Sequence, residues 1–174
     1  MKISSVLLLI LTLISGGSIS NSGNSHEQYE KRYFDIGYKE VEKALEESEK
    51  YFSEDIKLPT QLPPVNFTHS IGRLNKSEEK VNNELEIKYL NENLGENHYK
   101  IIIRPIQYKL PYSKEKIEQT LKLNNGKEAI YGTIEGFNIL VFETDKWQYT
   151  LCIDKRLSDK VTPQILVDIA NSVY

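Results

Sequence analysis

The chain has 174 residues, of which 39% are hydrophobic, 10% aromatic and 27% charged, with a formal net charge of −3 and one cysteine. This composition predicts a single soluble domain with appendages, and it excludes a largely disordered chain and a polytopic membrane protein. One cysteine excludes an intrachain disulfide framework and a cysteine-rich metal site. The charge lacks the basic excess of a nucleic-acid-binding surface, so no nucleic-acid partner is expected.

The first twenty residues have the pattern of a secretory signal peptide. Lys2 supplies a positive charge, and residues 6–14 form an almost uninterrupted apolar run. A helix needs about 20 apolar residues to span a bilayer, so this run is too short for a stable span. Small residues follow, and serines flank Ile19 in a pattern that predicts cleavage between Ser20 and Asn21. The alternative is a retained segment that anchors the protein in the membrane.

The sequence pattern of residues 21–57 predicts a short polar spacer followed by a charged amphipathic helix over about 27–56. Apolar side chains recur at steps of four and three residues, which is typical of one helix face; they are Phe34, Tyr38, Val41, Leu45 and Phe52. The segment 27–57 holds ten acidic and six basic residues, so the net negative charge lies here. Gly37 is a candidate break in the helix. The apolar stripe packs on the protein's own sheet in one interpretation and on a partner helix in the other.

Residues 58–174 predict an α+β domain with an antiparallel sheet of about six strands. Prolines between residues 58 and 64 favour an extended linker, because proline cannot continue a helix. Alternation and apolar runs predict strands over 66–74, 84–91, 98–106, 128–134, 137–143 and 147–154. Pro105 should end the third strand or place that strand at an edge of the sheet, and residues 113–123 fit a short helix or an extended segment equally well. Thr162 and Pro163 are typical of the start of a C-terminal packing helix.

Three segments carry a family resemblance. They are the opening Leu58-Pro59-Thr60-Gln61-Leu62-Pro63, the glycine-bounded hairpin that precedes Leu140-Val141-Phe142, and the final Ile169-Ala170-Asn171-Ser172-Val173. The stretch from 58 to 173 resembles a domain-of-unknown-function family of extracytoplasmic proteins from Gram-positive bacteria. Members of this family also occur as the outer portion of anti-sigma factors, and as small secreted proteins or lipoproteins. The chain departs from the family pattern at Phe142, where a tryptophan is usual. The resemblance implies an exported α+β module and assigns no catalytic residues.

The sequence contains no catalytic, cofactor or metal motif, so no such site is expected. His26, His69 and His98 are far apart in sequence, and none has a second ligand at metal-binding spacing. Cys152 on the last predicted strand is the one candidate thiol nucleophile, and Glu135 and Glu143 are candidate acids of a glycosidase pair. A buried cysteine and solvated turn acids explain the same residues more simply.

Eleven tyrosines are the one compositional excess, and Tyr38, Tyr99, Tyr108 and Tyr112 are candidates for an interaction surface, because tyrosine is favoured at interfaces. The expected function is that of a secreted, non-enzymatic interaction module at the cell surface or envelope, with a protein or a cell-wall polymer as partner. A membrane-tethered sensor or regulator is one alternative, and membrane contact is expected only if the signal segment is retained. A small extracellular hydrolase is the other.

N-terminal sequencing of the exported protein, combined with cell fractionation, tests the predicted export signal. Cleavage gives a soluble product that begins at Asn21, because the short apolar run is removed. A product that begins at Met1 and sediments with membranes would instead support the tethered sensor.

Overall fold

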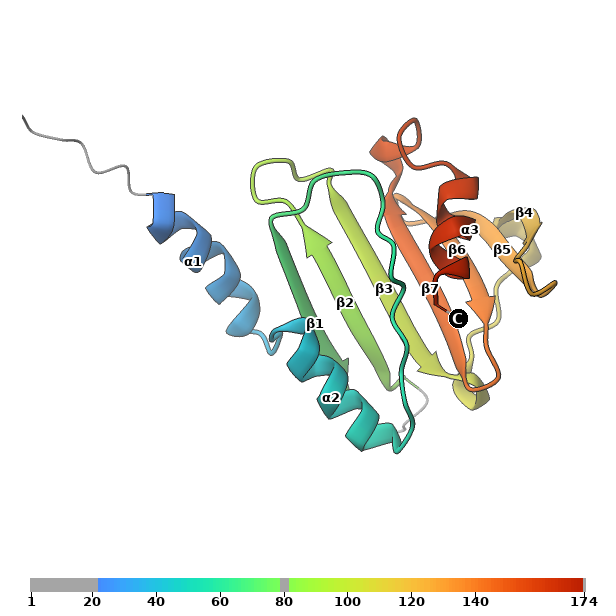
Figure 1. Cartoon of the computed structure of the whole chain (residues 1–174), viewed down its shortest axis with the longest axis horizontal. Coiled ribbons are helices and arrows are strands. Elements are labelled where there is room, and N and C mark those ends of the chain that lie inside the picture. The colour runs from blue at the N-terminus through green and yellow to red at the C-terminus, as the bar shows by residue number, and fades with distance from the viewer. Residues whose placement is uncertain (1–21, 79–81, 174) are drawn as a thin grey trace, which may run out of the picture.

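The computed structural model describes residues 22–78 and 82–173, so the predicted signal peptide and its cleavage site at Ser20 and Asn21 lie outside the described residues. The described chain forms an α+β structure of three α-helices and one seven-stranded antiparallel sheet (Figure 1). The helices are α1 (Ser22–Phe34), α2 (Val41–Phe52) and α3 (Pro163–Asn171). The strands are β1 (His69–Asn75), β2 (Glu84–Leu90), β3 (His98–Pro105), β4 (Ile117–Lys122), β5 (Glu128–Ile134), β6 (Phe137–Glu143) and β7 (Trp147–Asp154). Among these residues no helix has both the length and the apolar character that crossing a membrane requires.

Two antiparallel meanders, β1 to β3 and β4 to β7, join to make the sheet. The strand order is β1-β2-β3-β7-β6-β5-β4, so the meanders meet where β3 pairs with β7. This central pairing runs from Tyr99 opposite Ile153 to Pro105 opposite Trp147. Since β4 is the far edge strand, the chain between β3 and β4 must pass across the second meander. That connection holds short 3-10 helices at Ile106–Tyr108 and Lys114–Lys116.

One face of the sheet, the helix-covered face, carries the main core. Figure 1 shows α2 in front of the β1–β2 side and α3 in front of the β6–β7 side. Strand side chains that point to this face are fully or almost fully buried, among them Leu85, Ile87, Ile101, Ile103, Leu140, Phe142, Tyr149, Leu151 and Ile153. Burial of each large apolar side chain contributes about 1.5–3 kcal/mol, so this layer is the main source of stability.

The proline-containing linker fills the space between the two helices on that face (Figure 1). It contains no helix or strand from 55 to 68, as its prolines predict. Its carbonyl groups find partners on β7: the Trp147 indole donates to the Asp55 carbonyl at 2.9 Å, and the Tyr149 hydroxyl donates to the Lys57 carbonyl at 2.9 Å. These bonds satisfy the polar groups of two buried aromatic side chains, Trp147 and Tyr149.

The predicted helix over 27–56 is two helices, and the break lies at Gly37, the candidate position. Gly37 has a φ of +94°, which side-chain-bearing residues rarely adopt. After the break, Lys39 and Gly72 exchange two backbone hydrogen bonds of 2.9 and 2.8 Å, so the chain is fastened to β1 before α2 begins. The break also rotates the inner face of α1: Phe34 is 36% exposed, and Tyr29 and Tyr33 pack inward instead.

Six of the seven strands lie within about three residues of their predicted positions, and Pro105 is the last residue of β3 as expected. The additional strand is β4, which forms within the segment 113–123 that fitted either structure. Its side chains are mostly exposed, so it shows little of the alternation that identifies a half-buried strand. The C-terminal helix begins as predicted, with Thr162 accepting a hydrogen bond from the Ile165 amide and Pro163 in the first turn.

Gly72 is where α2 approaches β1 most closely, and Gly72→Ala should destabilise the fold. A Cβ at this position would lie 2.6 Å from the Ala44 Cβ. Overpacking of this kind lowers the free energy of unfolding by about 1–3 kcal/mol. Urea unfolding followed by circular dichroism measures the loss. Gly95→Ala is the control, because a Cβ there meets nothing within 4 Å and should change stability by less than about 0.5 kcal/mol. Equal stability of the two variants would contradict this packing.

Candidate functional site

The second face of the sheet, here called the charged face, carries Glu86, Lys88, Lys100, Arg104 and Thr150. It lies opposite the helix-covered face because successive side chains of a strand point to opposite sides. Strand pairing places Lys88 beside Lys100, and Ile102 beside Thr150, on this face. Ionisable groups lie close to one another on this face, which makes the face a candidate for binding chemistry.

One group on the charged face forms a closed network around Glu86. The Tyr38 hydroxyl donates to the Glu86 carboxylate at 2.8 Å, and Arg73 and Lys88 pair with the same carboxylate at 3.4 and 3.3 Å. Burial raises the pKa of Glu86, but the charge of Lys88, the Tyr38 hydroxyl and Arg73 outweigh it and hold the pKa below its ordinary value. Burial and the Glu86 charge together raise the pKa of Tyr38. The network therefore fastens the segment between α1 and α2, through Tyr38, to β1 and β2.

Arg104 on β3 is more deeply buried than Arg73 and Lys88, and its guanidinium is only partly satisfied. The residue is 7% exposed, and its Nη2 pairs with Glu84 on β2. Its Nη1, also buried, has no hydrogen-bond partner among the described residues. A buried donor without a partner carries a desolvation penalty of about 1–3 kcal/mol, more when charged. Such a group is therefore a candidate for contact with a ligand.

Arg104 lines a hollow of about 220 Å³ on the charged face. Apolar side chains form much of its wall, and its polar lining comprises Lys100, Arg104, Tyr112, Glu135 and Thr150. The Lys100 ammonium lies 4.3 Å from the centre of the Phe137 ring, and among the described residues no carboxylate lies within ion-pairing distance of it. The hollow therefore offers two cationic groups and two hydroxyls, with Glu135 exposed at the hairpin turn.

The connection between β3 and β4 forms one side of this hollow. Leu110 is held on β7 by two hydrogen bonds: its amide donates to the Gln148 side-chain oxygen at 2.9 Å, and the Gln148 amide group donates to the Leu110 carbonyl at 3.2 Å. Two residues later the Tyr112 hydroxyl lies 2.9 Å from the Thr150 hydroxyl. These contacts hold Tyr112 against the sheet, so the hollow has fixed walls. A second hollow of about 500 Å³ shares Leu110 and Tyr112 with it.

The candidate nucleophile and acid pair do not have the geometry of a hydrolase. Cys152 lies in the wall of the hollow at 5% exposure, and burial raises its thiol pKa to about 12. The described residues include no hydrogen bond between it and a histidine. Glu135 lies shortly before the first residue of β6 and Glu143 is its last residue, so the strand, at about 3.4 Å per residue, separates them by roughly 20 Å. Glycosidase carboxyl groups are about 5–10 Å apart, so these two acids cannot form such a pair.

The four candidate surface tyrosines do not form one surface. Tyr99 is fully buried on the helix-covered face, where its ring stacks on Tyr89, and Tyr38 is 4% exposed beneath α1. Tyr108 and Tyr112 are half-buried on the connection between β3 and β4. The expectation of a surface through Tyr38 and Tyr99 is therefore wrong, because sequence alternation does not reveal which faces other elements cover. Of the four, Tyr112 is the one that lines the 220 Å³ hollow.

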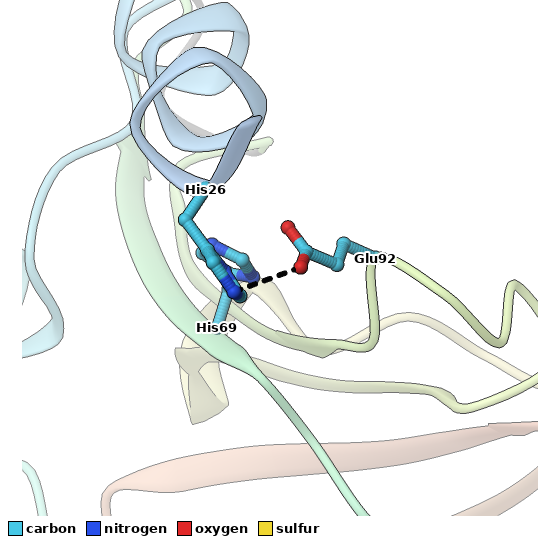
Figure 2. A group of neighbouring side chains, drawn as sticks. All are labelled: His26, His69 and Glu92. Atoms are coloured by element: carbon cyan, nitrogen blue, oxygen red, sulfur yellow. Dashed lines mark ion pairs between the residues drawn. The ribbon is translucent and has the colours of Figure 1, made fainter. Parts of the chain in front are cut away.

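Two of the three histidines, far apart in sequence, lie side by side in space. Figure 2 shows His26 of α1, His69 of β1 and Glu92, just after β2, pointing toward one another. One ligand atom from each lies within 4.8 Å of the others, and these are the residues of the described ranges that could hold a metal ion. His26 Nε2 lies 3.0 Å from a Glu92 carboxylate oxygen. His98 lies elsewhere, with its ring edge-on to Phe137.

The sequence contains one signal that indicates part of this group. His26, Tyr29 and Tyr33 recur at steps of three and four residues, which places them on one face of α1. The structure directs this face toward β1, where the Tyr29 ring lies 4.9 Å from the His69 ring.

Comparison of the chain with protein-family models, curated proteins and solved structures gave no match. The resemblance to an extracytoplasmic family of unknown function therefore stays a prediction from the sequence.

Cys152 should resist alkylation in the folded protein. Its high pKa leaves almost no thiolate at pH 8, and thiolate is the reactive form. We expect reaction with iodoacetamide at least about a hundredfold slower than in guanidinium chloride, where the thiol has an ordinary pKa. Mass spectrometry measures the rate. A Ser113→Cys/Cys152→Ser variant, whose thiol is exposed, is the control. Equally rapid labelling of both folded proteins would restore Cys152 as a candidate nucleophile.

Proposed function

We propose that this protein is an extracytoplasmic, non-enzymatic binding module whose charged face binds an oxyanion group, a phosphate or a carboxylate, carried by a larger partner. The observation that carries the proposal is the buried Arg104 guanidinium, which keeps an unpartnered donor beside a hollow also lined by Lys100. The export signal in the sequence supports the extracytoplasmic location.

The donors around the hollow match an oxyanion. Arginine presents planar N–H groups that fit phosphate and carboxylate oxygens, and lysine adds a compact positive charge. The Tyr112 and Thr150 hydroxyls lie on the same wall and are hydrogen-bonded to each other, so one of their two hydrogens is free to donate to a further oxygen. Binding would give the Arg104 Nη1 group the acceptor that it lacks among the described residues. A ligand without an acceptor oxygen would leave that buried donor unsatisfied, and an anionic oxygen makes a stronger hydrogen bond with it than a neutral one.

The size of the hollow indicates what part of a partner it can accept. Pockets for whole small molecules are usually about 300–1,000 Å³, and this one is about 220 Å³. It suits a single charged group at the end or along the side of a longer molecule. Exported partners with such groups are acidic proteins and anionic cell-wall polymers.

Among the described residues, the candidate catalytic groups named above are not placed to act together, which favours a binding role. The thiol of Cys152 is protonated at neutral pH, and the acids Glu135 and Glu143 are too far apart to act together. The Glu86 carboxylate is engaged with Tyr38, Arg73 and Lys88.

A titration of the isotopically labelled protein with sodium phosphate and, separately, sodium acetate tests the oxyanion site. Chloride must keep the ionic strength constant, since screening alone weakens charge interactions. We expect saturable shifts of amide signals around Lys100, Arg104 and Thr150 in nuclear magnetic resonance spectra. Lys100→Met should weaken binding at least fivefold because it removes the unpaired ammonium, and Arg104→Lys should do the same because it removes the planar donors.

Lys122→Met, on the exposed edge strand β4, is the matched control and should bind like the unchanged protein. Equal weakening by Lys122→Met and Lys100→Met would show nonspecific attraction and contradict the site. Titration with a glycerol-phosphate polymer and with an acidic peptide then distinguishes the two kinds of partner.

A further inference from the structure

We propose that His26, His69 and Glu92 form a binding site for a divalent transition metal of the Zn²⁺ class, which fastens α1 to the edge of the sheet. This site is separate from the oxyanion hollow and independent of it. Its three residues come from three different elements, α1, β1 and the turn after β2, and Figure 2 shows their side chains converging on one point.

The donor set suits zinc. Two imidazole nitrogens and one carboxylate oxygen are the ligands of many zinc sites, at about 2.0–2.2 Å from the metal. Two ligand atoms at these distances in a tetrahedron are roughly 3.3 Å apart. His26 Nε2 and the Glu92 oxygen are already 3.0 Å apart, and the three ligand atoms lie within 4.8 Å of one another. Small side-chain rotations therefore bring all three to one metal ion.

A single hydroxyl group contacts both the His69 ring and the Glu92 backbone. The Thr68 Oγ1 lies 2.8 Å from His69 Nδ1, and it accepts a hydrogen bond of 3.0 Å from the Glu92 amide. The Thr68 hydroxyl can donate to the Leu90 carbonyl at 3.4 Å. We therefore assign the His69 proton to Nδ1, donating to Thr68, which leaves Nε2 as the nitrogen for the metal. Outer hydrogen bonds of this kind fix the tautomer and ring orientation of zinc-binding histidines.

The metal would complete the attachment of α1. Tyr29 and Tyr33 pack the middle of the helix against Tyr38, Ile71 and Leu90. His26 lies one turn before Tyr29 on the same face, and its side chain is 51% exposed, whereas that of Glu92 is 11% exposed. A metal ion at this point therefore has an open path from solvent. Its coordination bonds would link the first part of α1 to β1.

Three protein ligands leave one tetrahedral position for water or for a group of a partner. The site thus differs from a closed structural zinc site, whose four positions are all filled by protein. The bound metal would order α1 and offer one further coordination position at the sheet edge.

Isothermal titration of the exported protein with Zn²⁺, and visible absorption with Co²⁺ as a spectroscopic substitute, test the site. We expect one metal ion per chain and Co²⁺ bands of a four-coordinate site. His26→Gln, His69→Gln and Glu92→Gln should each weaken Zn²⁺ binding at least tenfold. Thr68→Val should weaken it about 10–100-fold, although Thr68 does not touch the metal. His98→Gln, which changes a histidine outside the group, is the control and should bind like the unchanged protein.

Hydrogen exchange of the α1 amides provides a second measurement. Zn²⁺ should slow their exchange in the unchanged protein and in His98→Gln, but not in His26→Gln. His26→Gln changes a half-exposed side chain, so its circular dichroism spectrum should match that of the unchanged protein. Zn²⁺ binding that survives all three ligand substitutions, or that His98→Gln weakens as much as His26→Gln, would overturn the proposal.

Discussion

The register of β3 against β7 is the constraint on which the other features depend. This pairing joins the two meanders, and it places Ile101 opposite Leu151 on the helix-covered face and Lys100 opposite Cys152 on the charged face. A slip of one residue would turn the charged side chains of one strand toward the helix-covered face and its core. The apolar side chains on one face therefore determine where Arg104 and Thr150 lie on the other, and the oxyanion hollow follows from the packing of the core.

The four cationic groups of the charged face differ in their partners. Arg73 and Lys88 share the Glu86 carboxylate and lie over the Tyr38 ring, at 4.4 and 4.7 Å from its centre. Their charges are used to hold the chain between α1 and α2 on β1. Arg104 has one carboxylate partner, and Lys100 has an aromatic ring. Because unsatisfied buried donors are unfavourable in a free protein, their presence beside a hollow favours a ligand-binding role over a purely structural one.

Local sequence patterns predicted most of the fold, whereas the candidate sites depend on contacts between distant segments. The alternation of Leu85 and Ile87 with glutamates and a lysine identified β2 and its inner face, and Pro105 correctly marked the end of β3. The exposed strand β4 lacks such alternation, because neither of its faces is well covered, so its sequence left helix and strand open. Tyr99 could be placed on a strand but not in the core, since its burial depends on the linker and α2 covering that face.

The same distinction separates the two binding sites that we propose. The oxyanion hollow is built from neighbouring strands, so its polar side chains could in principle be grouped once the β3–β7 register was known. The metal group needs two further events: the Gly37 break must turn the chain, and α1 must lie along β1 so that His26 reaches His69. Neither event leaves a short-range motif like those of helix-borne zinc sites. The spacing of His26, Tyr29 and Tyr33 records only which face of α1 turns inward, and the identity of the surface that receives it is a property of the folded chain.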